Sequence, residues 1–392
     1  MKKTALLLII IITAAFINCD NTNDNKIEKI KDISFHVNPD RYRIAGVIDE
    51  EGESEKKMYF GDIVTDKCIK IFDLHGNILD SISLQKALKK LGSIENFTTS
   101  SKDSILVHSS YTNQIAIIDS DGNCWHHIDL HNKLYDDKGH YYEIHMPKLC
   151  KGNKSVFFNI GWGMEKSKNV EVPDNITELE YYYKKLYNDI PCFLKINNVY
   201  KENFYLEFGG SDIFENITDS FDSKLFADYP FYNVVNGRLL NASLYSDKLF
   251  VMDTSSLTVS KTVKIESEYT RIGGDFIKIE EISKKFQQLT DKYGYIRKIL
   301  YNEHVNKYVL VIRIENNRTP KNNMETEANP FSVMILDQDF NKLGEYVFDQ
   351  YEYLAYTTEL INEGLLIKQH NQNKDETVYT LFDVPELHAD NQ

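Results

Sequence analysis

The chain has 392 residues, and its 59 acidic residues outnumber the 45 lysines and arginines, so its net charge is −14 at neutral pH. The sequence contains no basic stripe, so neither nucleic acid nor an anionic glycan is an expected partner. Tyrosine and phenylalanine are abundant, at 25 and 21 residues, and this composition favours wide β-sheets.

The first 18 residues have the layout of an export signal. Lys2 and Lys3 precede an apolar run over residues 5–17, which is shorter than the roughly 20 residues that a membrane-spanning helix needs. Cys19 follows directly and predicts a lipid attachment site, because it stands where a bacterial lipoprotein is cleaved and acylated. The alternative is an ordinary signal cut after Ala15, although Asn18 before the cysteine departs from the small residue usual in lipoproteins.

A polar segment over 20–26 follows the cysteine and contains no apolar residue. We therefore expect a flexible tether over 19–30, a single folded domain over 31–385 and a polar tail over 386–392.

The folded part repeats one pattern six times. An apolar run closes on Asp or Asn at Asp73, Asp119, Asn197, Asp253, Asp337 and Asp383, spaced 46, 78, 56, 84 and 46 residues apart. Several runs are followed by a turn such as Asp121-Gly122-Asn123 and then by a second apolar arm, which predicts a β-hairpin. Units of about this length, each with the same order of strands, are typical of a β-propeller.

The pattern predicts an all-β propeller of six blades, with seven as the alternative. The blades are expected at 41–84, 93–130, 143–208, 230–265, 295–348 and 353–383. Short helical connectors are expected at 84–91, 174–187 and 279–293.

The last unit has too few strands for a complete blade. Residues 353–360, 365–368 and 377–383 supply three strands, and Pro385 ends the pattern. Residues 33–37 alternate apolar and polar ahead of the first blade. We therefore predict that they pair beside 377–383 and close the ring.

The sequence carries no motif for phosphate binding, a nucleophile elbow or a zinc protease. Residues 119–123 read Asp-Ser-Asp-Gly-Asn and are favoured as a turn over a calcium loop. A local concentration of histidines comprises His126, His127, His131, His140 and His145. It is interpreted as a solvated loop because consecutive strand residues such as His126 and His127 face opposite sides. No catalytic residue, metal site or cofactor is therefore predicted.

Four cysteines remain beyond Cys19, namely Cys68, Cys124, Cys150 and Cys192. Free buried thiols are the favoured interpretation, and their disulfide state is left open. Trp125 and Trp162 are candidates for an aromatic platform that binds glycans, with ordinary packing as the favoured alternative.

The lipoprotein start and three strand segments together resemble a family of Bacteroidota lipoproteins of unknown function, similar to six-bladed propellers. The segments are Tyr245-Ser-Asp-Lys-Leu-Phe-Val-Met-Asp253, residues 330–344 and residues 363–367. The resemblance implies a cell-envelope location, in the outer membrane, and supplies no site residues.

The sequence leaves two functions open. The favoured one is a binding or scaffold module, anchored in the bilayer through Cys19, that holds a glycan, peptide or protein on a propeller face. The alternative is an envelope hydrolase or lyase that acts on polysaccharide with carboxylates in the central channel.

Overall fold

A computed structural model describes most of the chain beyond the leader. The described residues are 27–40, 42, 44–48, 56–134, 142–150, 155–162, 191–210, 212–213, 231–235, 237–242, 246–273, 293–315, 329–348, 352–370 and 375–388. Cys19, the rest of the leader and the predicted helix 174–187 lie outside these ranges.

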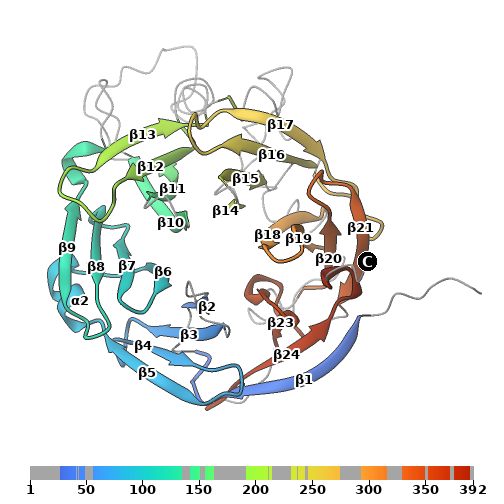
Figure 1. Cartoon of the computed structure of the whole chain (residues 1–392), viewed down its shortest axis with the longest axis horizontal. Coiled ribbons are helices and arrows are strands. Elements are labelled where there is room, and N and C mark those ends of the chain that lie inside the picture. The colour runs from blue at the N-terminus through green and yellow to red at the C-terminus, as the bar shows by residue number, and fades with distance from the viewer. Residues whose placement is uncertain are drawn as a thin grey trace, which may run out of the picture.

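The described residues form six four-stranded antiparallel sheets arranged in a ring, so the protein is a six-bladed β-propeller as predicted (Figure 1). The strands of each blade are named from the innermost to the outermost. Blade 1 contains β2 Ile44–Ile48, β3 Lys57–Asp62, β4 Cys68–Phe72 and β5 Ile78–Ser83; blade 2 contains β6 Asn96–Ser101, β7 Ser104–Ser109, β8 Gln114–Ile118 and β9 Cys124–Asp129; blade 3 contains β10 Tyr142–Cys150, β11 Ser155–Trp162, β12 Phe193–Asn197 and β13 Tyr205–Gly209. Blade 4 contains β14 Phe231–Val235, β15 Arg238–Ala242, β16 Lys248–Asp253 and β17 Val259–Lys264; blade 5 contains β18 Tyr295–Asn302, β19 Lys307–Arg313, β20 Phe331–Leu336 and β21 Lys342–Phe348; blade 6 contains β22 Glu359–Ile361, β23 Gly364–Lys368, β24 Thr377–Asp383 and β1 Glu28–Phe35.

The six apolar runs recognised in the sequence are the third strands of the six blades, β4, β8, β12, β16, β20 and β24. These strands are sandwiched between neighbouring blades, and in β12 and β20 every residue is buried. A strand covered on both sides reads as a continuous apolar run.

The hydrophobic core is divided among the junctions between blades. Six clusters of buried side chains each join two neighbouring blades, in the order 1–2, 2–3, 3–4, 4–5, 5–6 and 6–1. Burial of apolar area at every junction therefore holds the ring together.

The N-terminal strand closes the ring, as predicted. β1 pairs antiparallel with β24, with Ile33 opposite Tyr379 and Phe35 opposite Thr377. The strand begins at Glu28, so residues 28–30 belong to the sheet and the expected tether ends earlier than residue 30. Val37 follows the strand, and its carbonyl accepts a hydrogen bond from Thr377 Oγ1 at 3.1 Å.

The structure corrects the sequence-based expectations in two further places. Residues 353–360 were expected to form one strand, but a short 3₁₀ helix at Ala355–Thr357 interrupts them and β22 covers only Glu359–Ile361. The expected polar tail from 386 begins inside the fold, because Leu387 is buried within a second 3₁₀ helix, Pro385–Leu387. Its neighbour Glu386 accepts a hydrogen bond from the hydroxyl of Tyr346.

The predicted connector at 84–91 is confirmed as α2 Gln85–Leu91, which buries Ala87 and Leu91 against blades 1 and 2. The connector predicted at 279–293 lies outside the described residues except for Tyr293. None of the helices within the described ranges is both long and apolar enough to span a membrane.

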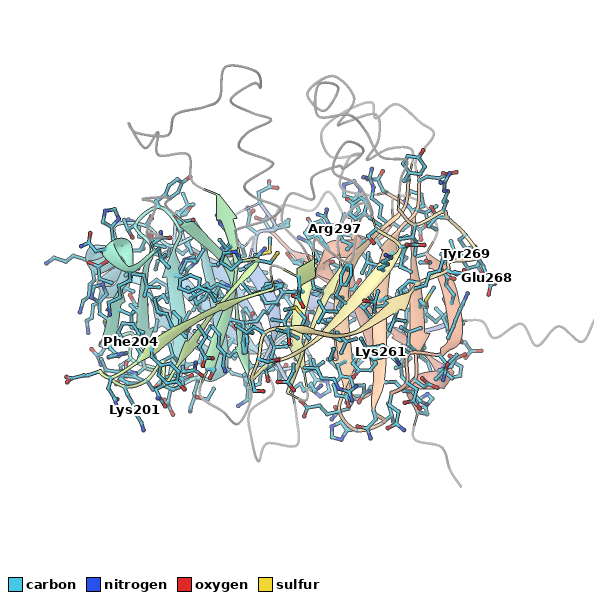
Figure 2. All side chains as sticks on the ribbon, turned by 90° about the horizontal axis from the view of Figure 1, so that it is seen from above. Lys201, Phe204, Lys261, Glu268, Tyr269 and Arg297 are labelled. Carbon is cyan, nitrogen blue, oxygen red and sulfur yellow. The ribbon has the colours of Figure 1, made fainter. Side chains whose placement is uncertain are left out.

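Each blade has its inner hairpin turn and its outer hairpin turn on the same face of the ring, which we call the lower face. Figure 2 shows Lys201, in the turn after β12, at the lower face, whereas Arg297, early in β18, lies in the upper half. The innermost strands therefore run from the upper to the lower face, and their last residues surround the lower mouth of the central channel.

Candidate binding site in the central channel

A cavity of about 420 Å³ opens at the lower mouth of the channel. All six blades contribute to its lining, mainly through their innermost strands (Figure 1). The lining residues are Val47, Lys56, Thr98, Thr99, Lys148, Leu149, Asn233, Val234, Val235, Gly237, Leu300, Tyr301, Glu303, His304, Glu359 and Leu360.

Two innermost strands carry a lysine immediately after a β-bulge. In β10 the register shifts between His145, which faces Asn159, and Lys148, which faces Phe157. The extra residue lies at Met146, whose φ of 49° is in the left-handed region. The hydroxyl of Tyr232 lies within hydrogen-bond reach of the Met146 carbonyl and of the Phe157 carbonyl, which is 2.8 Å away, and its single proton can be donated to either. This contact connects the bulge of blade 3 to blade 4.

The bulge decides where Lys148 points. Side chains alternate between the two faces of a strand, so one extra residue moves every following side chain to the opposite face. With the bulge, Leu149 lies opposite Val156 and packs in the cluster between blades 2 and 3. Lys148 points to the other side of the strand, and both residues border the cavity.

The same device recurs in β18. Its register shifts between Ile296, which faces Ile312, and Lys298, which faces Val311. Val311 belongs to the cluster between blades 5 and 6, so Lys298 is turned towards blade 6. There its amine contacts Glu359 of β22 at 2.7 Å.

The Lys298–Glu359 ion pair joins blades 5 and 6 close to the channel axis. The side chains are only 22% and 15% exposed, respectively, and the pair is therefore less screened than a surface pair. Glu359 also acts on the buried phenols of Tyr59 and Tyr379, although burial is the larger cause that raises their pKa values.

Lys148 differs from Lys298 because it has no hydrogen-bond or ion-pair partner among the described residues. Burial lowers the pKa of its amine below the ordinary 10.5, and the charge of Lys298 lowers it further, while Glu359 partly offsets both. Lys56, the other lysine of the lining, donates to the Leu360 carbonyl at 3.4 Å.

The rim of the cavity is polar. Asn233 donates from Nδ2 to the Ile299 carbonyl at 2.9 Å, which links blades 4 and 5. Glu303 and His304 stand in the turn after β18. A concave site with a few placed polar groups on a rigid scaffold is the usual form of a small-molecule site.

Four of the five histidines singled out in the sequence are described, and they are spread over three elements. His126 and His127 lie on the outermost strand β9, His131 begins a 3₁₀ turn, and His145 lies on the innermost strand β10, while His140 lies outside the described residues. The described residues contain no group of three side chains that could hold a metal ion. The 119–123 segment is a turn, in which Asp119 Oδ1 accepts hydrogen bonds from the backbone of Asp121 and Asn123.

Cys68, Cys124 and Cys192 are free thiols in blades 1, 2 and 3, and the side chain of Cys150 lies outside the described set. Trp125 stacks on Tyr200 with ring centroids 5.9 Å apart, which joins blades 2 and 3, and it is 48% exposed. The side chain of Trp162 is not among those described.

Sequence reasoning missed Lys56, Lys148, Lys298 and Glu359. One signal was available for Lys148, because Pro147 cannot donate a ladder hydrogen bond and commonly marks a bulge or a sheet edge. No comparable signal marks Lys298.

The fold and this cavity define a six-bladed propeller with a ligand-sized recess on its axis. The chain is similar to the crystal structure of a member of the DUF4221 family from Bacteroides vulgatus, with a TM-score of 0.69 and 17% identity over 91% of this chain and 98% of the other. A protein from Bacteroides fragilis gives a TM-score of 0.47 with 10% identity over 93% and 97% of the two chains. The propeller domain of Cps50 (Swd1) from Myceliophteria thermophila gives 0.43 with 9% identity over 91% and 99%. No family model matches the sequence, and no curated protein matches it.

Proposed function

We propose that the protein is a membrane-anchored envelope lipoprotein that binds a small ligand at the lower mouth of its central channel. One observation carries the proposal, namely the cavity of about 420 Å³ to which every blade contributes. Its volume falls within the roughly 300–1,000 Å³ of ordinary ligand pockets.

The size of the recess favours a saccharide unit, a short peptide end or a metabolite over a folded protein. A protein partner would need an interface on the order of 800 Å² on each side, which the recess alone does not provide.

The anchor rests on the sequence. The charged and apolar leader ends at Cys19, and acylation there would attach the chain to the bilayer. The described chain starts one residue before β1, at the outer rim of the ring (Figure 1), so the intervening polar residues suit a tether. The resemblance to Bacteroidota lipoproteins supports an outer-membrane location.

The hydrolase or lyase alternative has weaker support. The carboxylates in the described lining are Glu303 and Glu359, and Glu359 is already paired with Lys298. A glycosidase needs one carboxylic acid and one free carboxylate flanking the scissile bond. We therefore place binding ahead of catalysis.

A plugged channel tests the binding proposal. Val235→Trp should fill the recess, because Val235 lines it, and Val64→Trp serves as the control because Val64 is 75% exposed and lies outside the lining. The three proteins are compared on an array of envelope saccharides and peptides. We expect Val235→Trp to weaken binding of any hit by about tenfold or more, since it removes the space for the ligand. A folded Val235→Trp protein that binds like the parent would contradict the proposal.

A separate experiment tests the anchor. Cys19→Ser removes the thiol that would be acylated, so the protein should leave the membrane fraction or remain uncleaved. Retention of the variant in carbonate-washed membranes would show that something other than a lipid holds it.

A further inference from the structure

We infer that the ligand of this channel carries a negatively charged group, a carboxylate or a phosphate, that docks on Lys148 beside the Lys298–Glu359 pair. The inference rests on the proposed binding function and names the chemical class of the ligand.

The recess carries a local surplus of positive charge. Lys298 and Glu359 neutralise each other at 2.7 Å, and the lining then holds two further lysines, Lys56 and Lys148, against one further carboxylate, Glu303. This contrasts with the net charge of −14 of the whole chain. Glu303 and His304 stand on the rim, in the turn after β18.

Lys148 has no acceptor among the described residues. A partly buried ammonium group without a hydrogen-bond partner destabilises a fold. The fold does not need a lysine here, since methionine has a similar length and is neutral. A charged oxygen of a ligand would supply the acceptor that the described residues do not.

β-Bulges set the directions in which the side chains of Lys148 and Lys298 point. A bulge precedes Lys148 in β10 and another precedes Lys298 in β18, and each one disrupts its ladder. Without its bulge, Lys148 would lie on the side of the apolar cluster between blades 2 and 3. Bulges that re-aim a side chain are over-represented next to functional sites.

The resulting geometry suits one anionic group. Lys148 has no acceptor in the part of the chain that the structure describes, so its amine can donate to a ligand. The charge of Lys298, which is paired with Glu359, also acts on Lys148. Partial burial in the recess reduces the screening by water of the attraction between an ammonium and an anion. The remaining cavity then accommodates the uncharged part of the ligand.

Calorimetry on the purified full-length protein in detergent tests the inference, with citrate, inorganic phosphate and glucose as probes at constant ionic strength. We expect one of the two anions to bind and glucose to bind at least about tenfold more weakly, and the anion that binds distinguishes a carboxylate from a phosphate ligand. Lys148→Met should weaken that binding by about tenfold or more, because a charge-assisted hydrogen bond is lost. Lys264→Met removes the same charge from a side chain that is 65% exposed and should leave it unchanged.

The melting temperature without ligand gives a second readout. Lys148→Met should melt higher than the parent protein, because it removes an unpaired, partly buried charge. A lower melting temperature would show that the amine already has a structural role, and it would overturn the inference. Failure of both anions to bind would overturn it as well. If a neutral array hit is blocked by Val235→Trp and unaffected by Lys148→Met, channel binding stands and the anionic ligand does not.

Discussion

At the outer hairpin of three blades, an aspartate and an asparagine four residues later hold the turn in the same way. Asp73 Oδ1 accepts hydrogen bonds from the backbone of His75 and Asn77, and its Oδ2 accepts one from Asn77 Nδ2. The Asp119 and Asp337 turns repeat this arrangement. The sequence predicts these turns because the interaction is local and needs no knowledge of the fold.

The glycine in such a turn has a second role that depends on the neighbouring blade. Gly76 has a φ of +88°, and a Cβ built on it would lie 2.2 Å from the carbonyl oxygen of Ser34 in β1. Gly122 approaches the Ser83 carbonyl of β5 in the same way, at 2.3 Å. The outer turn of one blade therefore rests on the outermost strand of the preceding blade.

Gly76→Ala should consequently destabilise the ring. Gly92→Ala is the matched control, because Gly92 has a φ of +81° but nothing within 4 Å of a built Cβ. The control should cost about 1 kcal/mol for the left-handed conformation alone. Gly76→Ala should cost roughly 2 kcal/mol more, because the clash adds to that cost. Denaturant unfolding measures both, and equal costs would contradict the packing argument.

The lysines of the channel could not be predicted at the residue scale. Strict alternation along β10 would place the Lys148 side chain on the face that packs into the apolar core. Only the bulge at Met146 moves it to the opposite face. The extra residue Arg297 moves the Lys298 side chain to the opposite face of β18 in the same way. The position of a bulge depends on contacts between blades, such as the bond from Tyr232 to Met146, which a sequence does not display.

The elements differ in how far their sequences reveal them. The third strands are recognisable because both of their faces are covered. The innermost strand of blade 6 is harder to recognise: the sequence predicts a strand from residue 353, whereas β22 begins at Glu359. Tyr353 makes only an isolated bridge to Gln369, and the chain then turns through a 3₁₀ helix. Thr357 and Thr358 donate from Oγ1 to the carbonyls of Leu354 and Ala355 and stabilise that turn. Threonine is frequent in both strands and turns, so these two threonines do not indicate whether the segment forms a strand or a turn.

Glu345 of β21 connects two elements of neighbouring blades. Its side chain is fully buried and accepts hydrogen bonds from Ser267 and Ser332 Oγ at 2.6 and 2.7 Å and from the Glu268 backbone at 3.0 Å. The Lys342 amine contacts it at 2.7 Å. The segment after β17 is therefore held against blade 5.

This network predicts an acid-dependent stability. Burial raises the pKa of Glu345, but the bonds from Lys342, Ser267, the Glu268 backbone and Ser332 outweigh it and place the pKa below the ordinary 4.5. The carboxylate therefore stabilises the fold above pH 4.5, and this contribution is lost as the pH falls through the folded-state pKa. Glu345→Gln should reduce the free energy of unfolding at pH 7 by about 1–3 kcal/mol, and the difference should shrink in acid. Glu266→Gln, at a side chain 74% exposed, should show little change. A deficit of Glu345→Gln that is constant from pH 7 to pH 3 would contradict the assignment.

At the scale of the whole molecule, composition was a good guide to architecture and a poor guide to the site. The aromatic content anticipated the sheets, and the repeated runs gave the number of blades. The net charge of −14 argued against nucleic acid and anionic glycans as partners, yet the recess contains Lys148 without a partner among the described residues. An average over 392 residues contains no information on which few side chains the ring turns towards its axis.

Closure is the property that belongs to the ring as a whole. Phe35 of β1 packs against Phe60, Phe72 and Tyr379, with ring centroids 5.1, 5.5 and 5.8 Å away. These rings come from blade 1 and blade 6, so the N-terminal strand completes the cluster that joins the last blade to the first. The strand also covers the edge of β24, which would otherwise be open to pairing with another chain.

Two N-terminal truncations test whether β1 closes the ring or only adds a strand at its edge. A chain that lacks residues 20–38 loses β1, the Phe35 contacts and the hydrogen bond to Val37, so blades 6 and 1 lose the strand that joins them. We expect its melting temperature to fall by about 10 °C or more, since several kcal/mol are lost in a domain of this size. A chain that lacks only residues 20–26 keeps the whole of β1 and should melt like the parent. Size-exclusion chromatography should also show that the longer truncation self-associates through the freed β24 edge. If the two truncated chains melt alike, β1 merely lies along the rim and other contacts close the ring.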